Sequence, residues 1–81
     1  MNIRVLFFAQ LRDAMGAEER SVEAADGATA RQVVADVLSD SRLKKFSALP
    51  MRYAVNEEFI DPAMKLHDRD TLALIPPVAG G

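Results

Sequence analysis

The sequence predicts an α+β fold in which a mixed sheet of four to five strands packs on one main helix. Three observations support this prediction. Alternating apolar residues open the chain, a middle segment has a helical apolar stripe, and an apolar run of strand length precedes two prolines near the end. A chain of 81 residues has the length of a single small domain.

The first nine residues are predicted to form a central strand. Ile3, Val5 and Phe7 alternate with a second set that includes Leu6 and Phe8. Such β-branched and aromatic residues suit a strand. Because the second set is also partly apolar, we expect a central strand whose first side lies beneath a helix and whose second side faces outward.

A short helix and an edge strand are predicted next. Residues 10–15 place apolar side chains on one helical face, and Gly16 stands where it can end the helix. In residues 19–24, charged and polar side chains alternate with Val22 and Ala24. This pattern is typical of an edge strand, and its charges discourage association with another sheet.

The main helix is the clearest element of the chain. Thr29 and Gln32 have the spacing of a capping box, in which each side chain accepts a hydrogen bond from the other residue's backbone N–H. We expect the apolar stripe that follows to cover the sheet. The stripe consists of Ala30, Val33, Val34, Val37 and Leu38.

The second half of the chain is predicted to return to the sheet. Residues 41–49 are expected to add a helical turn that Pro50 stops. A strand is predicted at 51–55, followed by a turn at Asn56-Glu57 and a short returning strand at 58–60.

The last strand is predicted at 71–75. It ends there because Pro76 and Pro77 have no backbone N–H to continue a ladder. The predicted elements follow the order of a β-grasp (ubiquitin-like) sheet: strand, strand, long helix, strand, short strand, strand. In that fold the first and last strands are parallel central neighbours. We therefore expect a β-grasp domain over residues 1–75 and an extended, flexible tail over 76–81.

The terminal carboxylate of Gly81 is the candidate functional group. Gly80 and Gly81 have no side chains and can thread a narrow channel, and six extended residues reach roughly 20 Å. A carboxylate is a poor electrophile, so acyl chemistry there requires a second protein to activate it, for example as an acyl-adenylate. The alternative is an inert, frayed terminus. The tail consists of Pro76, Pro77, Val78, Ala79, Gly80 and Gly81.

Composition argues against several classes of function. Ten basic and twelve acidic residues give a net charge of −2 without a basic stripe, which disfavours nucleic-acid binding. The chain has no cysteine, and its one histidine, His67, lies in a polar turn, so no metal site is predicted. The apolar run 5–9 is too short for a signal peptide or a membrane span. We expect a cytoplasmic protein that does not enter the membrane.

Three segments resemble those of a known family. They are the opening Ile3-Arg4-Val5-Leu6-Phe7-Phe8-Ala9 with Leu11-Arg12 following, the motif Ala54-Val55-Asn56 before a turn, and the ending Leu74-Ile75-Pro76-Pro77-Val78-Ala79-Gly80-Gly81. Together they resemble the ubiquitin-like sulfur carriers, and within them the small subunit of molybdopterin synthase. Ubiquitin and the thiamine-pathway carrier share the Gly-Gly ending, whereas Pro-Pro-Val-x-Gly-Gly points to the molybdopterin branch. Arg69 departs from the glycine that the family commonly places between two aspartates.

The resemblance implies a sulfur-carrying role in molybdenum cofactor biosynthesis. An activating enzyme would use ATP to adenylate Gly81, which would then become a thiocarboxylate. Gly81 would donate this sulfur to the cyclic pyranopterin precursor, in complex with the large subunit of molybdopterin synthase as a heterotetramer. The chain itself would bind no cofactor and hold no catalytic machinery, so it would act as the sulfur-donating subunit of a sulfurtransferase.

Several alternatives remain open from the sequence. The chain resembles carriers for thiamine synthesis or transfer-RNA thiolation and ubiquitin-like modifiers that conjugate through Gly81, and it could also be a non-catalytic β-grasp interaction module. We expect Phe8, Ala73 and Ile75 to dock the partners, because apolar residues opposite the helix-covered face otherwise lack a purpose. The competing interpretation is ordinary surface hydrophobicity.

Overall fold

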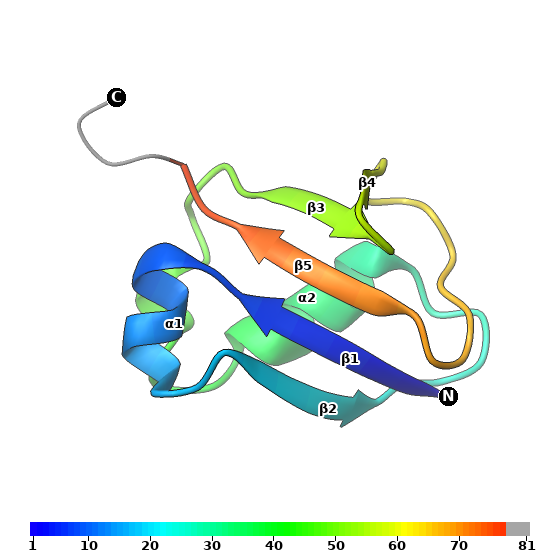
Figure 1. Ribbon diagram of the computed structural model, residues 1–81, viewed down its shortest axis with the longest axis horizontal. Coiled ribbons are helices and arrows are strands. Elements are labelled where there is room, and N and C mark those ends of the chain that lie inside the picture. The colour runs from blue at the N-terminus through cyan, green and yellow to red at the C-terminus, as the bar shows by residue number, and fades with distance from the viewer. Residues whose placement is uncertain (78–81) are drawn as a thin grey trace.

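The computed structural model describes residues 1–77. Its strands are β1 (Asn2–Phe7), β2 (Glu19–Glu23), β3 (Arg52–Val55), β4 (Glu58–Phe59) and β5 (Thr71–Ile75). Its helices are α1 (Ala9–Met15), α2 (Ala30–Leu38) and the short 3₁₀ helix η1 (Lys44–Phe46). The strands form one mixed sheet in the order β2-β1-β5-β3-β4, and α2 crosses one face of it (Figure 1).

Strand β5 lies at the centre of this sheet. It runs parallel to β1, with Val5 opposite Leu72, and antiparallel to β3, with Ala54 opposite Ala73. Strand β2 pairs antiparallel with β1 at one edge, and β4 pairs with β3 at the other. The predicted α+β, ubiquitin-like β-grasp arrangement is thus confirmed, including the parallel pairing of the first and last strands.

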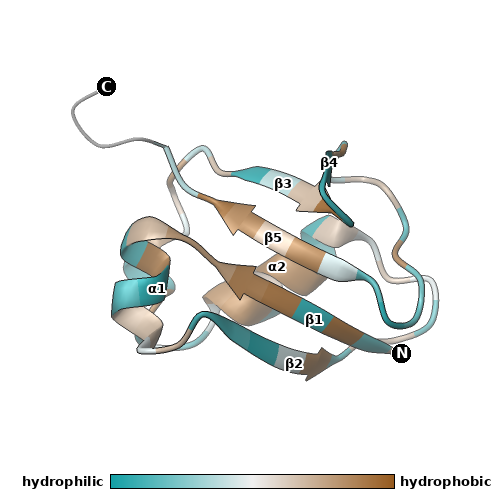
Figure 2. Ribbon diagram, in the orientation of Figure 1, coloured by the Kyte–Doolittle hydropathy of each residue, from teal (hydrophilic) through white to brown (hydrophobic). Residues whose placement is uncertain are grey.

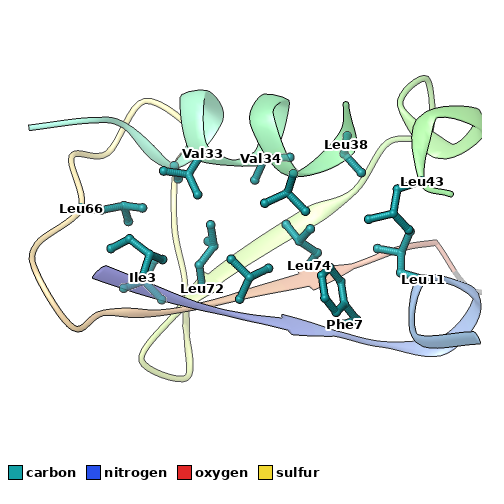
Figure 3. Close-up of a cluster of buried hydrophobic side chains, with 14 of the residues drawn as sticks. Ile3, Phe7, Leu11, Val33, Val34, Leu38, Leu43, Leu66, Leu72 and Leu74 are labelled. Atoms are coloured by element: carbon teal, nitrogen blue, oxygen red, sulfur yellow. The ribbon is translucent and has the colours of Figure 1, made fainter. Parts of the chain in front are cut away.

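The hydrophobic core lies between the sheet and α2. Figure 3 shows Ile3, Phe7, Leu72 and Leu74 of the sheet pointing toward Val33, Val34 and Leu38 of α2, while Leu11, Leu43 and Leu66 close the ends. The α2 stripe is buried as predicted: Ala30, Val33, Val34, Val37 and Leu38. Strands β1 and β5 are largely hydrophobic and the start of β2 is hydrophilic (Figure 2). Burial of one face therefore sets the orientation of each central strand.

Local signals in the sequence position both α-helices. Thr29 Oγ1 accepts a hydrogen bond from Gln32 N at 3.2 Å, and Gln32 Oε1 accepts one from Thr29 N at 2.9 Å. The predicted capping box is therefore present. Gly16 ends α1 with φ of 69°, a left-handed conformation that glycine adopts without strain. No helix in the described part of the chain has the length and hydrophobicity needed to cross a bilayer.

The segment 41–49 contains the predicted helical turn, which is the 3₁₀ helix η1. Leu43 is fully buried as expected, whereas Phe46 and Leu49 are only partly buried. Asp40 begins this turn, because its Oδ1 accepts a hydrogen bond from Arg42 N at 2.9 Å and its carbonyl oxygen accepts one from Lys44 N at 3.0 Å. The Arg42 side chain also donates to this carboxylate and lowers the pKa of Asp40.

A turn that precedes β5 holds a non-glycine residue in a left-handed conformation. Arg69 has φ of 69°, and Asp70 N donates to His67 O at 3.1 Å across the turn. This is the position at which type II turns favour glycine. Arg69 N donates to Asn2 O at 2.7 Å, and Asn2 N donates to Asp68 Oδ1 at 2.7 Å, so the turn is fastened to the start of β1.

Replacing Arg69 by glycine should stabilise the protein. We expect Arg69→Gly to raise the free energy of unfolding by about 0.5–1 kcal/mol, because relief of left-handed strain exceeds the added entropy of the unfolded chain. Urea unfolding measures this change. The matched control is Arg69→Ala, which removes the charge and keeps Cβ. An equal gain in both variants would contradict strain as the cause.

Truncating the buried end of α2 should have the opposite effect. We expect Leu38→Ala to lower the free energy of unfolding by about 2–5 kcal/mol, because the side chain packs in the core and its removal leaves a cavity. Arg31→Ala, on the exposed side of the same helix, serves as the control and should change stability little. Equal effects in the two variants would mean that α2 does not depend on this buried face.

Candidate functional site

The sheet face opposite α2 carries an apolar hollow of about 620 Å³. Its apolar lining comes from four strands and the residue that precedes α1. These side chains are Leu6, Phe8, Ala54, Phe59, Ala73 and Ile75. Phe59 is 58% exposed and Phe8 is 42% exposed, so both offer large apolar surfaces to solvent. The hollow falls within the size range of pockets that bind ligands or partner side chains.

Strand register explains why these residues meet. Because Val5 and Phe7 of β1 point into the core, Leu6 between them must point to the open face. Leu6 pairs with Ala73, Ala73 pairs with Ala54, and Ala54 pairs with Phe59. Paired residues share one face of a sheet. A single row of side chains therefore crosses four strands at this level.

All three residues predicted to dock partners line this hollow. Phe8 precedes α1, Ala73 lies at the centre of β5, and Ile75 is the last residue of β5. The structure brings them together on the expected face, and their role in binding stays a prediction. Ala73 lies at the bottom of the hollow, where its small side chain exposes little surface and makes the hollow deeper.

Sequence reasoning missed two members of the hollow, Ala54 and Phe59. The signal was present in the two-residue turn Asn56-Glu57, because a turn of this length sets the register of the hairpin that it joins. Asn56 and Glu57 both have positive φ, of 50° and 73°, as a type I′ hairpin turn requires. This register places Phe59 beside Ala54 on the open face.

Charged groups surround the hollow unevenly. Arg4 makes two hydrogen bonds to the carboxylate of Glu19, one of them from Nη2 to Oε1 at 3.0 Å. This hydrogen bonding raises the pKa of Arg4 and lowers the pKa of Glu19. The Arg52 guanidinium instead stacks on the Phe59 ring, 3.7 Å from its centroid. The charge of Arg4 is thus balanced within the chain, whereas that of Arg52 faces an aromatic ring.

The tail begins at the edge of the hollow. Strand β5 ends at Ile75, and the two following residues, Pro76 and Pro77, are outside the sheet, the first buried and the second exposed. Figure 1 shows the chain leaving from the end of the central strand. Val78, Ala79, Gly80 and Gly81 lie outside the described residues, so the candidate carboxylate is not placed by the structure.

His67 is in the polar turn where the sequence predicts it. Its side chain is 83% exposed, and its Nδ1 lies 3.9 Å from Asp70 Oδ2. Within residues 1–77, no group of three or more histidine, cysteine, aspartate or glutamate residues is arranged to hold a metal ion.

Comparison with known proteins gives the chain its family. A family model described as ThiS family matches residues 5–81. The molybdopterin synthase sulfur carrier subunit of Chlamydomonas reinhardtii is 34% identical over 83 residues, and the match covers 100% of both chains. These matches span the segments on which the resemblance was based, from the opening strand to the Gly-Gly ending.

Solved structures agree with this relationship. A putative molybdopterin converting factor subunit 1 from Pyrococcus furiosus is 25% identical, with a TM-score of 0.82 over 96% of this chain and 99% of the archaeal one. A chain in the complex of subunits 1 and 2 of molybdopterin-converting factor from Helicobacter pylori is 27% identical, with a TM-score of 0.73 over 100% of both chains. This chain belongs to the ThiS family and, within it, to the family of molybdopterin synthase sulfur carrier subunits.

Proposed function

We propose that this chain is the sulfur carrier of molybdopterin synthase and that Gly81 carries the sulfur. The observation that carries this proposal is the continuity between the apolar hollow and a Pro-Pro-Val-Ala-Gly-Gly tail that starts at its edge. The hollow offers a surface for binding, and the tail offers a terminal carboxylate for chemistry. The match of the whole chain to named sulfur carrier subunits supports the same assignment.

Activation of Gly81 is the first chemical step of this proposal. Its carboxylate attacks the α-phosphorus of ATP on an activating enzyme, which releases pyrophosphate and forms an acyl-adenylate. A nucleophile of the hydrosulfide class then attacks the acyl carbon, the bond to AMP breaks, and a thiocarboxylate remains. The carboxylate needs this activation because in its ionised form it is a poor electrophile. ATP belongs to the activating partner, and this chain contributes the acyl group.

Sulfur donation takes place on a second partner, the large subunit of molybdopterin synthase, in a cytoplasmic heterotetramer. The thiocarboxylate sulfur attacks the cyclic pyranopterin precursor, because sulfur is a softer and stronger nucleophile than the carboxylate oxygen that it replaces. Water then hydrolyses the resulting thioester, which leaves the sulfur on the pterin and returns Gly81 as a carboxylate. A dithiolene contains two sulfur atoms, so two loaded carriers are used for each product. The chain positions the donor atom, and the partner supplies the catalytic groups.

Docking of the large subunit is assigned to the open sheet face. Phe8, Ala73 and Ile75 belong to it, together with Phe59, which the hairpin brings alongside. Exposed aromatic side chains of this kind are enriched at protein interfaces. Because Ile75 immediately precedes the tail, a partner bound here lies within the roughly 20 Å that residues 76–81 can span. Domain 1–75 would then bind while the tail 76–81 reaches the active site.

Extending the tail tests the terminal-carboxylate mechanism. One alanine appended after Gly81 moves the carboxylate by about 3.3–3.6 Å, whereas productive geometry tolerates fractions of an ångström. We expect adenylation and thiocarboxylate formation to be lost while large-subunit binding persists. Intact mass spectrometry detects the exchange of one oxygen for sulfur, and calorimetry measures binding. Val78→Ala is the control and should remain active, because it keeps the backbone length.

Normal sulfur delivery by the extended chain would contradict this mechanism. It would favour the interaction module with an inert tail instead. A chain that lacks Gly80 and Gly81 distinguishes the same two readings, since a sulfur carrier loses its function completely and an interaction module retains it.

A charge placed at Phe8 tests the docking face. Phe8 occupies the N-cap position of α1 and its side chain makes no capping hydrogen bond, so aspartate, a favoured N-cap residue, should preserve the fold. We expect Phe8→Asp to weaken large-subunit binding by about fivefold or more, because it removes an apolar contact and adds a charge. Titration calorimetry measures the affinity, and thermal unfolding checks the fold.

The control for this experiment is Ser21→Asp. Ser21 is exposed, pairs with Arg4 on the same sheet face and lies outside the hollow, so the variant adds the same charge beyond the proposed contact. Equal affinities of the Phe8→Asp and Ser21→Asp variants would remove Phe8 from the docking face.

A further inference from the structure

Two alanines form the floor of the hollow. Ala54 of β3 and Ala73 of β5 are directly paired across the strands and are only 7% and 9% exposed. They occupy the outward side of two inner strands, where β-branched and aromatic residues are the common choice. Their small side chains leave unfilled the space at the middle of the open face.

Larger apolar side chains flank this floor on both sides and at the end from which the tail leaves. In the row that crosses the sheet, Leu6 flanks Ala73 and Phe59 flanks Ala54. Ile75 lies two residues further along β5, at the end from which the tail leaves. The open face is thus concave at its centre and raised at its rim, a shape that accepts a protruding side chain.

The raised side formed by Phe59 is held in place before any partner arrives. Arg52 stacks on its ring at 3.7 Å, and Ile60 N donates to Tyr53 O at 3.1 Å just beyond β4. Asn56 N donates to Thr71 O at 2.9 Å and anchors the hairpin turn to β5. Because Phe59 is already held in this way, its side chain loses little conformational entropy when a partner binds.

Two charges of opposite sign lie beside the hollow. The Arg52 guanidinium lies over Phe59, next to the lining, and Glu57 lines the hollow from the hairpin turn. Neither residue forms an ion pair with another residue of the described chain. Arg4, by contrast, is already engaged by Glu19. A partner that is complementary to this pattern presents a carboxylate to Arg52, beside Phe59.

We propose that the Ala54–Ala73 floor determines partner specificity by receiving one bulky apolar side chain of the large synthase subunit, beside a carboxylate of that subunit that reaches Arg52. The inference rests on the proposed function, because the large subunit is the partner that must accept the tail and therefore lies over Ile75. A central buried anchor surrounded by a ring of supporting contacts is the usual arrangement of an interface hot spot. Here this chain supplies the recess above Ala54 and Ala73, which we call the socket, and the partner supplies the side chain that fills it.

A size series at Ala54 tests the socket. The variants are Ala54→Ser, Ala54→Val and Ala54→Leu, and calorimetry with the large subunit from the same organism gives each affinity. We expect Ser to bind within about twofold of the parent chain and Leu to bind about tenfold or more weakly, with Val between them, because added side-chain volume fills the socket. Thermal unfolding of each variant should stay close to that of the parent chain, since the position faces outward.

Two controls separate socket filling from other effects. Ser21→Leu adds the same side chain on the same face outside the hollow and should bind normally. Arg52→Gln should weaken binding and reduce its dependence on salt, whereas Arg52→Lys should keep the salt dependence because it keeps the charge. An unchanged salt dependence in Arg52→Gln would overturn the assigned carboxylate.

The outcomes distinguish this inference from the function on which it rests. If Ala54→Leu binds the large subunit as tightly as the parent chain, and the parent chain delivers sulfur, the socket is overturned and the proposed function stands. If Ala54→Leu loses affinity only for the activating enzyme, the assigned occupant is overturned. If the parent chain itself neither binds the large subunit nor acquires sulfur at Gly81, the proposed function fails and the inference fails with it.

Discussion

Placement of β5 between β1 and β3 is the constraint on which the rest of the structure depends. Leu72 and Leu74 must point into the core beneath α2, so Ala73 and Ile75 must point to the open face. A slip of one residue would exchange these two sets. Core burial therefore determines which side chains the open face presents. The same strand leads directly into the tail, so the packing that stabilises the fold also sets the point from which the tail departs.

The chain separates binding from chemistry. Binding groups lie on a sheet whose geometry is held by a buried core, and the proposed reacting group lies beyond Pro76 and Pro77, which cannot join the ladder. Cysteine is absent from the whole chain. The residues of the open face offer apolar area and a few charges, which suit recognition of a protein surface. This division is consistent with a carrier that presents one reactive atom to different enzymes in turn.

Departures from local rules lie around this sheet and have identifiable causes. Arg69 is strained because its turn must return the chain to β5 while it stays bonded to Asn2. The alanine pair at Ala54 and Ala73 forgoes packing that larger residues would supply. The first departure is explained by chain connectivity. The second leaves a concave surface, which is why we assign it to recognition.

Sequence alone determined the elements with a clear local signal, and tertiary structure decided how distant elements meet. The alternation of Ile3, Val5 and Phe7, the Thr29–Gln32 capping box and the Pro76-Pro77 stop depend on neighbouring residues, so periodicity and capping rules were sufficient. The family resemblance also followed from the sequence, whereas the chemistry at Gly81 stays a proposal. The local pairing of Ala54 with Phe59 could be derived from the two-residue turn between them. The pairings of Ala73 with Leu6 and with Ala54 were not predictable in the same way, because they depend on strand order and register between residues far apart in the chain.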